Sequence, residues 1–244
     1  MNCLVLGCFA AFLLTNVLSS AQSLQMNRWL NTGSEKERTQ KLISLGIRDD
    51  QARLAAGEDV QWRPIRSESQ SGLAVLFVPC GSFEESGLYL LEEGNKGWHV
   101  EDRTGFDCHY DDSVSISMAS VRTPNVDDIL VHHECEERGT GYLEQHFNVL
   151  VVESGKFKII LNVKEVVNES GWPEKSEFRL RSKFALVPSR LGSRIIEETR
   201  CTDDNGRISV RKRRFRWDES ALRLIPSKFV SVGAVDNKSK PSCR

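Results

Sequence analysis

The chain has 244 residues and a formal net charge of −1, with 39% hydrophobic and 27% charged residues. This composition is typical of a globular protein, and the near-neutral charge argues against a general polyanion-binding protein. A chain of this length can bury a substantial core, in one large domain or in two small ones.

Residues 1–21 are predicted to be a secretory signal peptide. The apolar run from Leu4 to Leu18 is too short to span a membrane comfortably, and the small residues Ser19, Ser20 and Ala21 follow it. We therefore expect a mature start near Gln22, a secreted or periplasmic location, and no transmembrane segment after cleavage. The alternative is a buried or membrane-resident N-terminal helix.

Residues 27–60 are predicted to be helical. Ser34 and Glu37 have the spacing of a capping box, and apolar residues at helical spacing follow them. Gly46 separates two short helices, the second of which is expected to end at Gly57. The favoured interpretation is a helical pair that packs on the following sheet, and the alternative is a docking element.

Residues 70–230 are predicted to form an antiparallel β domain. Short apolar or alternating segments recur with glycine- and asparagine-containing turns between them, a pattern typical of antiparallel sheets. We predict a mainly β fold, either a partial propeller or sandwich-like, with a disordered tail over residues 233–244. The predicted strands are 73–78, 88–91, 97–100, 114–121, 127–131, 147–152, 157–167, 178–187, 195–200 and 207–217.

Part of this β region resembles a known family. The unit from Leu88 through Trp98 to the strand beginning DDILV at Asp127, followed by a hairpin around Gly155, is similar to exported proteins with FG-GAP or VCBS-type propeller repeats. The resemblance covers roughly residues 73–166 and implies propeller-like sheets. In that family an acidic loop before the D-(I/L)-(L/V) strand binds calcium. The corresponding loop here, RTPNVD over 122–127, lacks most of the oxygen ligands and the turn glycine.

Of the seven cysteines, Cys3 and Cys8 fall within the predicted signal peptide. Four of the remaining five are candidates for two disulfides, with Cys243 in the polar tail left unpaired. Four cysteines allow three connectivities, of which pairing between sequence neighbours is favoured; buried free thiols are the alternative. The disulfide candidates are Cys80, Cys108, Cys135 and Cys201.

All five histidines lie between residues 99 and 146, together with two cysteines. If His133 and Cys135 share one face of a strand, they could form a tetrahedral zinc site with His109 or Cys108 on a neighbouring strand. This His99–His146 region is therefore the candidate site of an exported enzyme or metal-binding protein. The alternative is ordinary strand histidines beside a disulfide, and no nucleophile or metalloprotease motif is present in the sequence.

The segment around residues 207–217 combines adjacent cations with aromatic residues. Such a segment could bind an anionic polymer of the cell envelope, whereas export argues against nucleic acid. The alternative is a strand with a solvated, charged outer face that protects a sheet edge. The candidate binding residues are Arg211, Lys212, Arg213, Arg214, Phe215 and Trp217.

The sequence therefore predicts an exported, non-catalytic binding or structural module. Its partner would be an anionic envelope polymer or a protein, and no cofactor is expected. Zinc and calcium are the two metals that its residues bring into consideration. The competing hypothesis is an exported enzyme or metal-binding protein that uses the His/Cys region.

Overall fold

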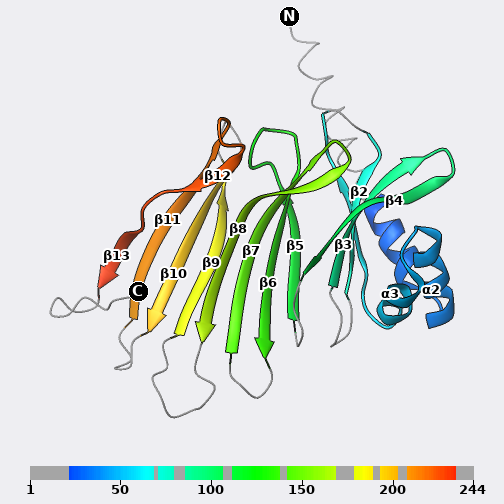
Figure 1. Cartoon of the computed structure of the whole chain (residues 1–244), viewed down its shortest axis with the longest axis horizontal. Helices are drawn as coiled ribbons and strands as arrows, with labels where there is room; N and C mark the ends of the chain where they lie inside the picture. The colour runs from blue at the N-terminus through cyan, green and yellow to red at the C-terminus, as the bar shows by residue number, and fades with distance from the viewer. Residues whose placement is uncertain are drawn as a thin grey trace, which may run out of the picture. The chain divides into compact units, whose positions relative to one another are not determined.

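The computed structural model describes residues 22–68, 71–79, 86–106, 112–137, 142–168, 179–188, 193–202 and 208–234. The chain divides into two compact units, Met1–Phe106 and Asp107–Arg244. Its strands form three antiparallel sheets, and short helices precede them (Figure 1), which confirms the predicted mainly β class. Among the residues that the structure describes, no helix has the length and apolar character needed to cross a bilayer.

The described part of the first unit begins with three short helices. A helix occupies residues 22–31, and α2 (Glu35–Ser44) and α3 (Asp49–Ala55) follow it. The predicted capping box is confirmed: Ser34 Oγ accepts a hydrogen bond from Glu37 N at 3.4 Å, and Glu37 Oε2 accepts one from Ser34 N at 2.7 Å. The backbone N–H and the hydroxyl of Ser34 both donate hydrogen bonds to the Glu37 carboxylate, and these two bonds lower the pKa of Glu37. Gly46 has a φ of +97° and so permits the turn between α2 and α3.

Four strands in consecutive order form the sheet of this unit. β2 is buried along its whole length, as its continuous apolar sequence predicts. One face of the sheet packs on the helices through a core that includes Trp62, Leu76 and Tyr89. The strand that contains Pro64 was not predicted, and it lies at the sheet edge, where proline is tolerated. The strands are β1 (Gln61–Ile65), β2 (Leu73–Val78), β3 (Ser86–Gly94) and β4 (Gly97–Phe106).

The second unit contains the other two sheets. In the first of these the order is β5-β6-β7-β8, and in the second it is β12-β11-β10-β9, with β13 also paired to β11. The predicted hairpin around Gly155 is confirmed, with Ser154 and Gly155 at φ values of 53° and 73°. The strands are β5 (Asp112–Ala119), β6 (Asp128–Glu137), β7 (Tyr142–Glu153), β8 (Lys156–Asn168), β9 (Arg179–Val187), β10 (Arg194–Thr202), β11 (Ile208–Asp218), β12 (Arg223–Pro226) and β13 (Val230–Ala234).

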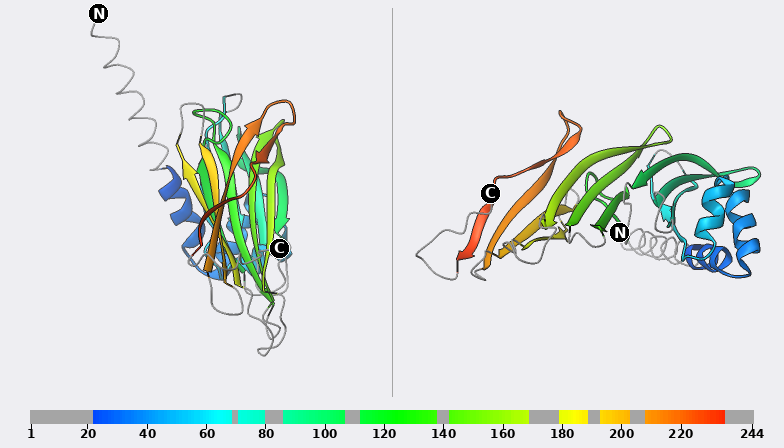
Figure 2. Two further views of the ribbon diagram at one scale, coloured as in Figure 1. Left: turned by 90° about the vertical axis from the view of Figure 1, so that its left-hand side faces the viewer. Right: turned by 60° about the horizontal axis from the view of Figure 1, so that its bottom comes forward.

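The core of the second unit lies between its two sheets. Phe147, Val149 and Val151 project from alternate positions of β7 and pack in one cluster with Ile195 of β10 and Phe215 of β11. The strands that carry these residues are long and strongly curved (Figure 2). Both sheets therefore contribute to one core, and space remains between β5–β7 and β9–β10. β13 extends into the predicted tail, and residues 235–244 lie outside the described ranges.

Candidate functional site

A pocket of about 520 Å³ opens between the two sheets of the second unit. Its lining comes from β5, β6 and β7 on one side and from β9 and β10 on the other. One part of this lining is apolar. The rings of Phe147 and Phe184 stack with centroids 4.0 Å apart and planes only 6° from parallel. Leu130 and Ile195 extend this apolar wall, which offers a flat surface for an aromatic or aliphatic group.

The other part of the pocket lining is polar. Ser115 and Ser117 are exposed on the edge strand β5, where Ser115 is the direct cross-strand partner of His132. Gln145 and Ser182 are buried residues of the lining. The side-chain carbonyl of Gln145 accepts a hydrogen bond from the backbone N–H of Ser182 at 3.2 Å. The pocket therefore offers hydrogen-bonding groups beside its aromatic wall.

Ser182 connects this pocket to a buried charged cluster. Its hydroxyl donates to Glu197 Oε1 at 3.2 Å and lies 2.9 Å from the hydroxyl of Thr199. Thr199 also donates to Glu197, whose other oxygen accepts a hydrogen bond from Arg213 Nε at 2.5 Å. Glu197 is 0% exposed, and a carboxylate at such a depth requires a paired cation and hydrogen-bond donors. This network holds the Ser182 side chain in place on the pocket wall.

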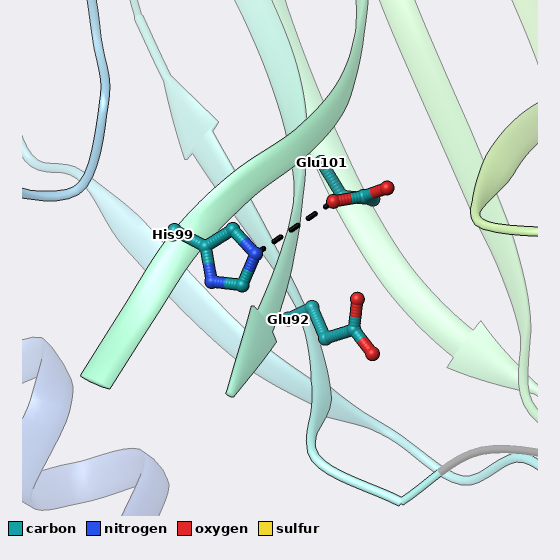
Figure 3. Close-up of side chains that lie close together, drawn as sticks. All are labelled: Glu92, His99 and Glu101. Carbon is teal, nitrogen blue, oxygen red and sulfur yellow. Dashed lines mark ion pairs between the residues drawn. The ribbon is translucent and has the colours of Figure 1, made fainter. Parts of the chain in front are cut away.

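A second cluster lies in the first unit, on the β3–β4 hairpin (Figure 3). Glu92 and His99 are direct cross-strand partners, and Glu101 follows His99 by two positions. One possible ligand atom from each of the three side chains lies within 4.8 Å of the other two. His99 Nε2 is 3.7 Å from Glu101 Oε2. The arrangement combines the nitrogen and oxygen donors that borderline divalent metals accept.

The predicted zinc residues are only partly described. His133 is buried in β6, and its ring stacks on that of His146 with centroids 4.4 Å apart. Cys135 lies two positions further along β6, but only its backbone is described, and His109 falls outside the described ranges. The zinc set of His109, His133 and Cys135 therefore stays a prediction.

The four disulfide candidates are also only partly described. Cys135 and Cys201 are placed by their backbones alone, on β6 and β10 of the second unit. Cys80 and Cys108 belong to the part of the chain that the structure does not describe. The pairing of the four cysteines stays a prediction.

The basic segment of β11 divides between the two faces of its sheet. Register places Arg211, Arg213 and Phe215 opposite Thr199, Glu197 and Ile195, on the face toward the core. Trp217 continues this set by alternation and packs against the core, and Arg211 and Arg213 both lie over the ring of Phe229, at 4.1 and 4.5 Å. The intervening residues point the other way: Lys212 forms an ion pair with Glu198 at 2.7 Å, and Arg214 is exposed.

The loop that corresponds to the calcium-binding loop of propeller repeats is held by an internal ion pair. Asp128 Oδ2 accepts hydrogen bonds from the backbone N–H groups of Val121 and Arg122, both at 2.9 Å. Its Oδ1 accepts from Arg122 Nε at 2.8 Å. The Asp128 carboxylate is fully buried, so the guanidinium of Arg122 supplies the positive charge that a bound cation would otherwise provide.

The pocket residues were not identified as a site from the sequence. The alternation of serines along β5 was the available signal, because it places Ser115 and Ser117 on one face of the strand. The contribution of Ser182 and Phe184 depends on how the second sheet packs against the first, which periodicity along the chain does not encode. Comparisons with protein-family models, curated proteins and solved structures find no match for this chain.

Proposed function

We propose that this protein is an exported, non-catalytic module that binds a small amphiphilic molecule in the pocket of its second unit. The observation that carries the proposal is the stacked pair Phe147–Phe184 beside a row of hydroxyl-bearing residues in one pocket. The pocket volume, about 520 Å³, falls within the range of about 300–1,000 Å³ that is usual for small-molecule sites.

The lining chemistry supports a ligand with an apolar body and an acidic head. Aromatic and aliphatic surface on the pocket wall would bury the body, and the gain is about 25 cal/mol for each Å² of apolar area removed from water. Lys183, His132 and the serines of β5 carry the N–H and O–H donors that a carboxylate or phosphate head would accept. Medium-chain fatty acids and similar amphiphiles combine these two features.

Export is the second element of the proposal. Asn27 and Asn31, in the helix over residues 22–31, form hydrogen bonds with the backbone of Trp62 and Val60. Cleavage near Gln22 would leave both asparagines in the mature chain, which is compatible with a signal peptide that ends at residue 21. Intact-mass measurement on protein from the exported fraction tests this element, and a mass that retains residues 1–21 would contradict it.

Ligand binding is tested by titration with 11-dansylaminoundecanoic acid, an apolar chain with a carboxylate head and an environment-sensitive fluorophore. We expect saturable binding to the native chain. Ser117→Phe should fill the pocket and Phe184→Ala should remove half of the aromatic stack, so both should weaken binding by about tenfold or more. Thr123→Phe and Ile159→Ala also add a ring or truncate a large apolar side chain, but at exposed positions outside the pocket lining, and they should bind as the native chain does.

Two results would reject the pocket as the site. One is the absence of saturable binding by the native chain, and the other is equal affinity in the native chain and Ser117→Phe. Thermal unfolding of each variant without ligand shows whether the fold is retained. Ser117 is exposed at the edge of its sheet, so the added ring can be placed without displacing core residues.

A further inference from the structure

We propose that Glu92, His99 and Glu101 in the first unit form a binding site for a single Zn²⁺ ion. This site shares no residue with the pocket of the second unit or with the zinc set predicted from the sequence. Figure 3 shows the imidazole of His99 and the carboxylate of Glu101 turned toward one another, with the Glu92 carboxylate beside them. The three possible ligand atoms lie within 4.8 Å of one another.

The β3–β4 hairpin fixes the three positions through its register. Glu92 and His99 occupy directly opposed positions, in the third pair of residues from the turn, so their side chains leave the sheet on the same face. The register then shifts: Leu91 pairs with Val100 and Leu90 pairs with Asp102, which leaves Glu101 as the extra residue of a β-bulge. Bulges redirect a side chain and occur frequently next to functional sites. Here the bulge residue is itself one of the three possible ligands.

The separation between His99 and Glu101 fits two ligands of a common ion better than it fits a hydrogen bond. Their facing atoms, Nε2 and Oε2, are 3.7 Å apart, whereas a charge-assisted hydrogen bond has a length of about 2.7–2.9 Å. A nitrogen and an oxygen that each lie about 2.1 Å from one tetrahedral zinc ion are roughly 3.4 Å apart. Small rotations of the side chains would therefore bring these atoms to zinc-binding distances.

Charge and access support the same assignment. Two carboxylates held this close repel one another, and a divalent cation between them would replace that repulsion with attraction. The side chains of His99 and Glu101 are 52% and 42% exposed, so an ion can reach them from solvent. A Cβ at Gly94 would lie only 3.3 Å from Cε1 of His99, which shows how closely the imidazole packs over the glycine. Three protein ligands with solvent access leave a fourth zinc position for water.

The test is zinc titration of the purified, tag-free chain, with isothermal calorimetry for affinity and native mass spectrometry for stoichiometry. We expect one bound zinc ion in the native chain. Glu92→Gln, His99→Ala and Glu101→Gln should each weaken zinc binding by about tenfold or more, because each removes one of three ligands. Zinc should raise the unfolding temperature of the native chain and have a much smaller effect on His99→Ala.

Two control variants distinguish this site from other sources of zinc affinity. Glu93→Gln makes the same charge change at the next residue, which pairs with Trp98 and lies on the opposite face of the sheet. His146→Ala removes one member of the stacked histidine pair in the second unit. Both should bind zinc as the native chain does. The proposal is overturned if no zinc binds, if His99→Ala retains native affinity, or if Glu93→Gln weakens binding as much as Glu92→Gln does.

Discussion

Asn31 and Val60 are joined by two hydrogen bonds that run in opposite directions. The backbone N–H of Val60 donates to Asn31 Oδ1 at 3.0 Å, and Asn31 Nδ2 donates to the Val60 carbonyl at 2.7 Å. One helical turn earlier, Asn27 makes the same pair of bonds with Trp62, at 2.7 and 2.9 Å. The spacing of the two asparagines along the helix matches the spacing of their two partners, because four residues of helix rise by about 6 Å and two residues of strand by about 6.6 Å.

These asparagines therefore pair with the edge of β1 as a neighbouring strand would. An exposed edge strand presents unpaired N–H and C=O groups, which favour association with other chains. We expect Asn27→Ala and Asn31→Ala each to lower the free energy of unfolding by about 1–3 kcal/mol, because each leaves partly buried backbone groups without a partner. Urea unfolding measures this loss. Gln25→Ala, at an exposed position of the same helix, is the control, and losses no larger than its own would contradict the role of the amides.

The ion pair between Arg213 and Glu197 should contribute far more than the adjacent pair between Lys212 and Glu198. Glu197 is fully buried, so Arg213→Ala would leave a carboxylate in the core without its cation, a change that costs about 3–5 kcal/mol. Lys212 and Glu198 are 41% and 27% exposed, and such surface pairs contribute about 0–1 kcal/mol. Chemical denaturation of Arg213→Ala and Lys212→Ala makes the comparison, and equal losses would show that the buried pair contributes no more than the surface pair.

Local signals in the sequence were sufficient to predict most of the helices, strands and turns. The capping box at Ser34, the buried strand 73–78 and the turn at Gly155 each depend on a few adjacent residues, and the structure confirms all three. The strand with Pro64 was missed because its short, mixed sequence carries no clear alternation. It is placed by contacts with Asn27 and Asn31, about 30 residues earlier in the chain.

The candidate sites depended on information that a single segment does not carry. The run from Arg211 to Arg214 resembles one cationic surface in the sequence, but alternation along β11 directs Arg213 to a buried carboxylate and Lys212 to the other face. In the same way, Glu92 and His99 are separated by a turn and become neighbours only through the register of the hairpin. To predict either arrangement, one must know which strand is the pairing partner and in which register, and the residue pattern alone does not specify this.

The loop before β6 should not respond to calcium. Arg122 already pairs with Asp128, so a calcium ion would have to displace a guanidinium and two backbone hydrogen bonds from the same carboxylate. We expect the unfolding temperature to be the same with calcium and with chelator, as measured by differential scanning fluorimetry. Asp128→Ala should lower stability by about 2–3 kcal/mol, because the buried N–H of Val121 loses its acceptor. A calcium-dependent rise in stability that disappears in Asp128→Ala would overturn this interpretation.

Acidification should weaken the pair between Glu198 and Lys212. The hydrogen bond from Lys212 lowers the pKa of Glu198 in the folded chain. A carboxylate with a lowered folded-state pKa stabilises the fold above its unfolded value of about 4.3, and this contribution is lost as the pH falls through the folded value. Urea unfolding between about pH 6 and about pH 3 should therefore show a shallower decline for Glu198→Gln than for the native chain. Parallel declines would indicate that this pair is fully screened by solvent.

Leu222 offers a substitution that should stabilise the protein. It lies in the turn between β11 and β12 with a φ of 49°, in the left-handed region that a leucine side chain disfavours. Its side chain is 52% exposed, so little packing is lost when it is removed. We expect Leu222→Gly to raise the free energy of unfolding by about 0.5–1 kcal/mol, since relief of backbone strain exceeds the entropy that glycine adds to the unfolded chain. Ala221→Gly, one residue earlier and without a positive φ, should instead lower it. If the two glycine variants lose stability equally, the exposed leucine contributes packing that outweighs its strain.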